Sequence, residues 1–81
     1  MALVVGLERG ESKRAQVHRT QLVAKFRTIS EGGRTTVLQL DTYGSSAREL
    51  PNKLSQTIQF DRKTAKELWR LLNEEFHFDK D

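Results

Sequence analysis

Side chains that could carry out covalent or acid–base chemistry are few in this sequence, and they lie far apart. There is no cysteine, and most of the chain separates the two histidines, His18 and His77. Ser45 and Ser46 have no base near them in the sequence and do not belong to a nucleophile elbow. We therefore expect no catalytic residue, no metal site and no cofactor, in a protein that is not an enzyme.

Residues suited to bind nucleic acid are more numerous. Lysine and arginine neutralise phosphates, amide side chains hydrogen-bond to base edges, and an aromatic ring stacks on an unpaired base. The candidate nucleic-acid-binding residues are Arg14, Arg19, Lys25, Arg27, Arg34, Gln39, Tyr43, Arg48, Lys53 and Gln59. Since stacking contributes only about 1–3 kcal/mol per base, the cations have to supply much of the affinity.

The charge distribution favours the same kind of partner. The net charge is +3, from 14 basic and 11 acidic residues, but residues 9–34 alone carry seven bases and two acids. Such a cluster attracts phosphate backbones, although an ordinary solvated surface has a similar composition. Asp41 argues for the second interpretation, because it lies among the candidate residues and would repel phosphate.

The elements that must position these side chains follow from the hydrophobic periodicity. Residues 62–76 repeat apolar side chains every three or four positions, which predicts an amphipathic helix. Asp61 directly precedes this segment and is expected to act as its N-cap. Residues 35–43 and 55–60 alternate polar and apolar side chains, which predicts two strands.

For the rest of the chain, residues typical of turns help to decide between helix, strand and loop. Residues 21–29 fit one face of a helix or of a strand, and the Gly32-Gly33 pair favours the strand, because a tight hairpin needs residues with positive φ. Residues 44–53 are expected to form a loop longer than a usual hairpin connection. A further strand is predicted over residues 2–7. Residues 1–20 as a whole are expected to be either an extra strand or a mobile basic arm.

Alternation along the strands divides the predicted sheet into two faces. The residues expected to pack on the helix are Phe26, Leu38, Leu40, Ile58 and Phe60. The residues expected on the opposite, polar face are Lys25, Arg27, Gln39, Asp41, Tyr43, Thr57 and Gln59. Val23, Ile29 and Val37 also point to the polar side and suggest a dimer surface. Trp69 is expected in the helix–sheet core or at a dimer contact, with ligand stacking as the alternative.

Composition limits the size of the core. Only 36% of the residues are hydrophobic, against about 45–50% in an average globular protein. We expect a single small α+β domain over residues 1–81, an antiparallel sheet of about four strands followed by one C-terminal helix packed on one face. Homodimer formation would supply the stability that such a core lacks. No segment is typical of a membrane span or a signal peptide, which predicts a cytoplasmic protein with no membrane partner.

Several short elements together resemble one known family. They are residues 25–27, the Gly32-Gly33 turn, residues 37–43, a basic loop with Pro51 and Lys53, and residues 57–61 leading directly into the helix. This order resembles the positive cofactor four type of transcriptional coactivator and its small bacterial and phage relatives. The resemblance implies a curved antiparallel sheet, a C-terminal helix, dimerisation through both, and single-stranded DNA binding. It implies strand and loop contacts to DNA by Lys25, Arg27, Tyr43 and Lys53.

We therefore expect a non-catalytic module that binds nucleic acid, preferably single-stranded DNA, in transcription or DNA processing. It would act by electrostatic capture and stacking. The alternative is a protein-interaction or inhibitor module, such as a phage or accessory-locus protein, that docks on a larger partner through the sheet face.

Overall fold

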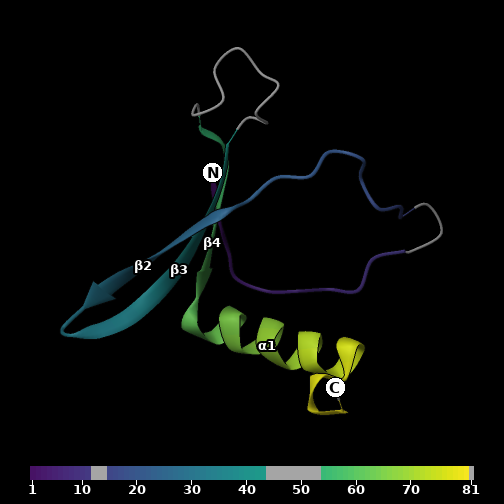
Figure 1. Ribbon diagram of the computed structural model, residues 1–81. Coiled ribbons are helices and arrows are strands. Elements are labelled where there is room, and N and C mark those ends of the chain that lie inside the picture. The colour runs from purple at the N-terminus through teal and green to yellow at the C-terminus, as the bar shows by residue number, and fades with distance from the viewer. Residues whose placement is uncertain (12–14, 44–53, 81) are drawn as a thin grey trace.

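A mixed four-stranded sheet followed by one helix forms the α+β fold of this protein (Figure 1). The computed structural model describes residues 1–11, 15–43 and 54–80. Its elements are β1 (Ala2–Val4), β2 (Lys25–Glu31), β3 (Arg34–Tyr43), β4 (Leu54–Asp61), α1 (Arg62–Phe76) and the short 3-10 helix η1 (Phe78–Lys80).

The strands lie in the order β1-β4-β3-β2. The pairs β2–β3 and β3–β4 are antiparallel, as expected, but β1 runs parallel to β4. The predicted antiparallel sheet is therefore confirmed for β2, β3 and β4, whereas the edge strand β1 pairs parallel. Two parallel strands cannot be joined by a tight turn, and residues 5–53, which include β2 and β3, separate β1 from β4.

The hairpin between β2 and β3 has the predicted turn. Gly32 and Gly33 have φ values of 58° and 75°, and Glu31 pairs with Arg34 across the turn. Two consecutive residues with positive φ fit the right-handed twist of the flanking strands. The strand interpretation of residues 21–29 is confirmed from Lys25 onward, whereas residues 21–24 precede the strand.

The helix begins and ends where its sequence predicts. The Asp61 carboxylate accepts a hydrogen bond from the Thr64 amide at 2.8 Å, which satisfies one of the unpaired first-turn donors. At the other end His77 adopts the left-handed conformation, with φ of 56°, and its amide donates to the Asn73 carbonyl at 2.9 Å. This geometry ends α1 at Phe76.

The core is smaller than the five-residue core expected from the strand pattern. Among the described residues Phe60 is the only buried hydrophobic side chain, while Leu38 and Leu40 are half-buried. Phe26 remains 72% exposed and Ile58 39% exposed, so the expected packing of these two residues on the helix is wrong. Because β4 passes into α1 without a loop, the helix lies at the end of the sheet and leaves most of the apolar face uncovered (Figure 1).

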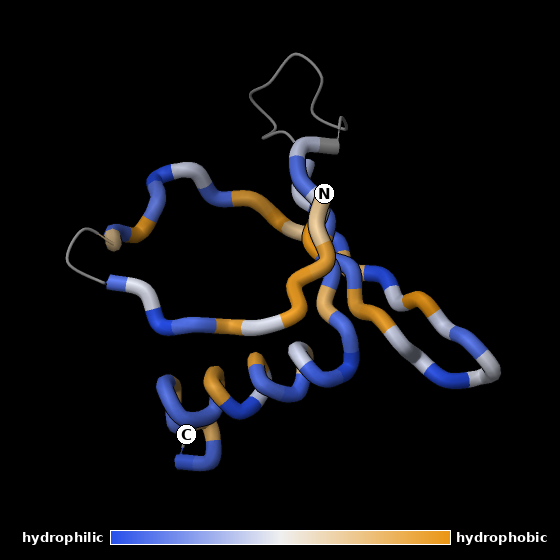
Figure 2. Tube along the Cα trace, turned by 180° about the vertical axis from the view of Figure 1, so that it is seen from behind, coloured by the Kyte–Doolittle hydropathy of each residue, from blue (hydrophilic) through white to orange (hydrophobic). Residues whose placement is uncertain are grey.

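The chain is also more open than its size requires. It exposes 7641 Å², whereas a compact protein of this mass exposes about 5000 Å². The radius of gyration is 15.2 Å, against about 12 Å for a compact domain of this length. The segment after β1 runs beside α1 (Figure 2). Arg9 in this segment forms an ion pair with Glu75 at 2.6 Å. No helix among the described residues is long and apolar enough to cross a membrane.

Candidate nucleic-acid interface

The register of β2, β3 and β4 brings polar side chains from all three strands to one face. Lys25, Asp41 and Thr57 occupy directly paired positions, and Arg27, Gln39 and Gln59 occupy the next row on the same face. Side chains in such rows are close enough to interact directly. Five of the predicted binding residues therefore lie together on this face, which we call the polar face: Lys25, Arg27, Gln39, Tyr43 and Gln59.

Asp41 is the centre of the hydrogen-bond network on the polar face. Its carboxylate accepts hydrogen bonds from the Thr57 hydroxyl at 2.7 Å and from the Gln39 amide at 3.0 and 3.2 Å. The Arg27 Nε lies 3.0 Å from its second oxygen. The hydrogen bond from Thr57 is the main reason that the pKa of Asp41 is lowered, and Gln39 and Arg27 add to it against the opposing effect of burial.

Burial reduces the negative charge that Asp41 presents on the polar face. The residue is only 2% exposed, beneath the side chains that neutralise it. Its charge is therefore largely compensated before it can act on a phosphate above the sheet. The same ion pair engages one edge of the Arg27 guanidinium, although that side chain remains 60% exposed.

A cluster of cations and an aromatic ring lies beside this network. The Lys25 ammonium lies 5.0 Å from the centre of the Tyr43 ring, which is a cation–π distance. The Arg27 Nη2 donates a hydrogen bond to the Tyr43 hydroxyl at 3.4 Å. The Gln59 amide donates to the Gln39 side-chain oxygen at 2.8 Å, which orients both amides. In this arrangement the cations can contact a phosphate and the Tyr43 ring can stack on a base.

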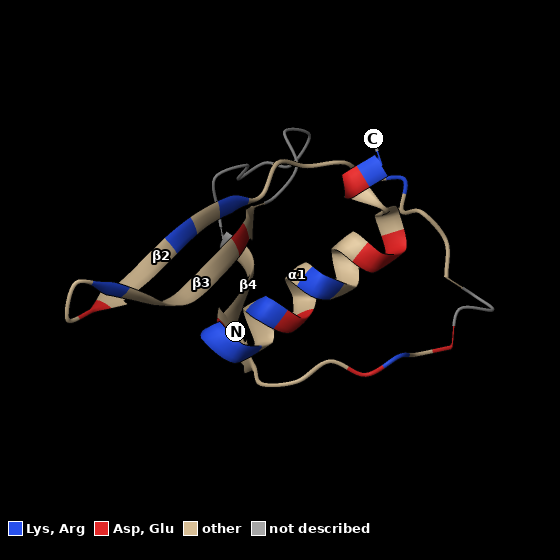
Figure 3. Cartoon of the chain, turned by 90° about the horizontal axis from the view of Figure 1, so that it is seen from below, with Lys and Arg blue, Asp and Glu red and all other residues tan. Residues whose placement is uncertain are grey.

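The remaining predicted residues lie elsewhere. Arg34 begins β3 at the hairpin turn, and Arg19 is exposed in the connection between β1 and β2. Figure 3 shows that basic residues also lie along β2 and α1. Arg14, Arg48 and Lys53 lie outside the described residues. In the suggested dimer patch, Ile29 and Val37 are paired neighbours, but Val23 precedes β2 and is 87% exposed.

A second basic and aromatic group, which the strand pattern did not identify, lies on α1. Trp69 is 66% exposed, so its expected burial in the helix–sheet core is wrong for the single chain. It lines a groove together with Arg62, Lys66 and the first half of β3. The spacing of residues 62, 66 and 69 is the sequence signal that places them on one helix face.

No group of three or more histidine, cysteine, aspartate or glutamate residues in the described ranges lies close enough together to hold a metal ion.

Comparisons of the chain with protein-family models, curated proteins and solved structures find no match. The resemblance to the positive cofactor four type of coactivator therefore stays a prediction.

Proposed function

We propose that this protein binds single-stranded nucleic acid on the polar face of its sheet, without catalysis and in the cytoplasm. The observation that supports this most directly is the clustering of Lys25 and Arg27 around the Tyr43 ring. The two cations come from β2 and the ring from β3, so the hairpin is what brings them together.

Each part of the cluster has a role in this proposal. The Lys25 ammonium and the exposed edge of the Arg27 guanidinium attract phosphates, and the Tyr43 ring offers a surface for one base. Gln39 and Gln59 supply amides that are already oriented by their mutual hydrogen bond. Bases inside a duplex are stacked on one another and cannot reach the ring, so stacking favours single strands.

We further propose that the partner on the opposite face is a second copy of the chain. Phe26, Leu40 and Ile58 occupy directly paired positions across the sheet and form an apolar row, in which Phe26 and Ile58 are exposed and Leu40 is half-buried. Exposed apolar patches of this kind mark interaction surfaces. The same open face favours docking on a larger, different protein as the second candidate function.

Binding to labelled oligothymidylate, followed by fluorescence anisotropy, tests the main proposal. We expect tight binding at low salt, weaker binding to a duplex, and an affinity that falls steeply as salt rises. Tyr43→Ala should weaken binding about 5- to 150-fold, the range measured for losing one stacked base. Lys25→Gln should weaken it and reduce the salt dependence.

The matched control is Lys80→Gln, which removes the same charge from η1, far from the polar face in the sequence. It should bind as the unmodified protein does, apart from the small effect of net charge. Failure of the protein to bind oligothymidylate at low salt would overturn the proposal. Equal loss in Lys25→Gln and Lys80→Gln would show that the polar face is not the site.

A further inference from the structure

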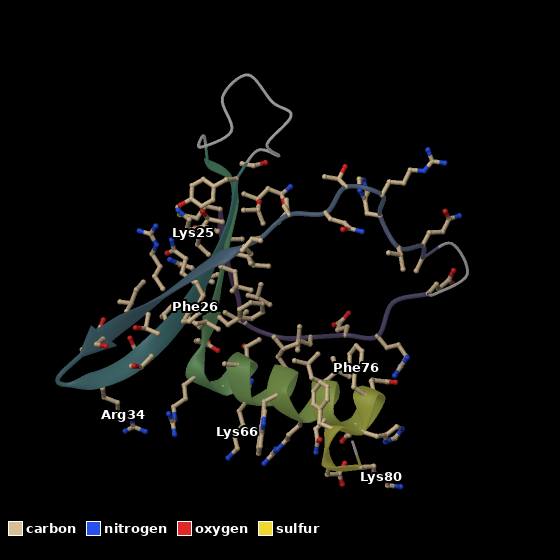
Figure 4. All side chains as sticks on the ribbon, viewed as in Figure 1. Lys25, Phe26, Arg34, Lys66, Phe76 and Lys80 are labelled. Atoms are coloured by element: carbon tan, nitrogen blue, oxygen red, sulfur yellow. The ribbon has the colours of Figure 1, made fainter. Side chains whose placement is uncertain are left out.

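One face of α1 carries cations and the single tryptophan of the chain. Arg62, Lys66 and Trp69 are spaced by four and three residues, so they share a face of the helix. A different groove, between α1 and the segment after β1, is lined on the helix by Glu67, Leu71, Leu72, Glu75 and Phe76. Figure 4 shows Lys66 and Arg34 pointing to the same side of the molecule, away from that segment.

The basic and aromatic face of α1 forms one wall of a groove of about 410 Å³. The opposite wall is the first half of β3, where Thr35 and Thr36 contribute hydroxyls and Val37 and Leu38 an apolar surface. Asp61 is the only acid that lines this groove, and its carboxylate is engaged by the Thr64 amide. The groove therefore combines cations, hydroxyls and an exposed aromatic ring.

Unlike Arg27 of the polar face, the cations of this groove form no ion pair with another described residue. Within the described residues, the ion pairs join Arg9 to Glu75, Arg27 to Asp41 and Lys63 to Glu67. None of these pairs involves Arg62 or Lys66. Their charge is therefore available to an anionic partner, whereas Arg27 has to share its guanidinium with a buried carboxylate.

From this geometry we infer that the groove between α1 and β3 is a second contact for single-stranded nucleic acid. A base stacks on Trp69, and the phosphates that flank it are neutralised by Arg62 and Lys66. Tryptophan offers a large stacking surface, and a groove with cations on its rim suits a charged strand better than an apolar protein segment. The inference rests on the proposed function, because it extends the same ligand to a second surface.

The intrinsic fluorescence of Trp69 tests the stacking directly, because the chain has no other tryptophan. Titration with unlabelled oligothymidylate should quench this fluorescence with the same midpoint as the anisotropy titration. If oligothymidylate binds but leaves the tryptophan emission unchanged at saturation, the inference is overturned while the proposed function stands. If no binding is seen by either method, both fail.

Substitutions separate stacking from phosphate contact. Trp69→Ala should weaken binding about 5- to 150-fold with an unchanged salt slope, and Trp69→Phe should recover part of the loss. The double variant Arg62→Ala with Lys66→Ala should lower the slope of log affinity against log salt by about 1.4, since each phosphate contact on a single strand contributes about 0.7. Circular dichroism checks that each variant keeps its helix.

The matched control is the double variant Lys63→Ala with Lys80→Ala, which removes the same charge from residues that do not line the groove. Its salt slope should stay close to that of the unmodified protein. Equal slopes in the two double variants would show that only net charge matters and would overturn the inference.

Discussion

Asp41 determines how much of the positive charge on the polar face can reach a ligand. It lies in a row with Lys25 and Thr57 and holds the Arg27 guanidinium 3.0 Å from one carboxylate oxygen. A buried carboxylate that accepts this many hydrogen bonds orients its neighbours, and it also reduces the charge that Arg27 presents. Stability and binding should therefore respond to its removal in opposite directions.

The effect of Asp41 on stability is expected to depend on pH. Its pKa is lowered below the value of the unfolded chain, so its contribution is present above about pH 4 and is lost as pH falls through the lowered pKa. Asp41→Asn should be less stable than the unmodified protein at pH 7, and the difference should narrow at pH 3. Urea denaturation at both pH values measures this, and a constant difference would contradict the assigned role.

The same substitution should strengthen binding to single strands. Asp41→Asn releases Arg27 from its ion pair, and one additional phosphate contact would raise the salt slope by about 0.7. Asp79→Asn, which changes the net charge equally in η1, is the control. An identical change in both variants would mean that Arg27 gains no contact when Asp41 is neutralised.

At the scale of elements, the β2–β3 hairpin decides which side chains meet. Its two-residue turn pairs Glu31 with Arg34, and a one-residue register shift between Ile29 and Ser30 then sets the pairing that places Lys25 and Arg27 beside Tyr43. A slip of one residue would send them to the other face. The helix has a different role, because it starts directly at the end of β4 and so creates the groove beside β3. Each element is formed by residues that are close in the sequence. The polar face depends on the hairpin, and the groove depends on the helix.

The turn can be tested through its glycines. Gly33→Ala should lower the free energy of unfolding by about 1–2 kcal/mol, because a side chain is strained in the left-handed conformation. An added Cβ meets no atom within 4 Å at this position, so backbone strain is the only expected cost. Gly10→Ala is the control, since it has the same open surroundings without a positive φ. Equal stability of the two variants by urea denaturation would argue against a strained turn.

At the scale of the whole molecule, the main feature is apolar surface without a partner in the single chain. Phe26, Trp69 and Phe76 are all more than half exposed, and the chain exposes far more area than a compact protein of its mass. Large exposed apolar patches mark interaction sites or cause aggregation. The proposed second copy would cover the row of Phe26, Leu40 and Ile58, on the side opposite the polar face.

Sedimentation of the purified protein tests the proposed dimer. We expect a dimer at micromolar concentration and a shift toward monomer in Phe26→Asp, with a dissociation constant raised about 30-fold or more, as for a central aromatic anchor. Phe26 is 72% exposed in the single chain, so the charge should not unfold it. Val17→Asp places the same charge at a 99% exposed position and should remain a dimer. A monomeric unmodified protein would favour docking on a different protein instead.

Much of the secondary structure could be predicted because its signals are local. The helix bounds follow from a cap and a period of three to four, and the hairpin follows from the Gly32-Gly33 pair. The division into a polar and an apolar face follows from alternation, so Lys25, Arg27 and Tyr43 could be placed together before their contacts were known. Periodicity says which side chains share a face, but it does not say what covers that face.

What the sequence by itself determined was the set of elements and the composition of each face, since these depend on neighbours along the chain. The tertiary structure alone decided the parallel pairing of β1, the ion pair that joins Arg27 to the buried Asp41, and the exposure of Phe26 and Trp69. These depend on a crossover between distant residues and on the angle at which α1 leaves β4. No short-range pattern records either one, because both result from the packing of the whole chain.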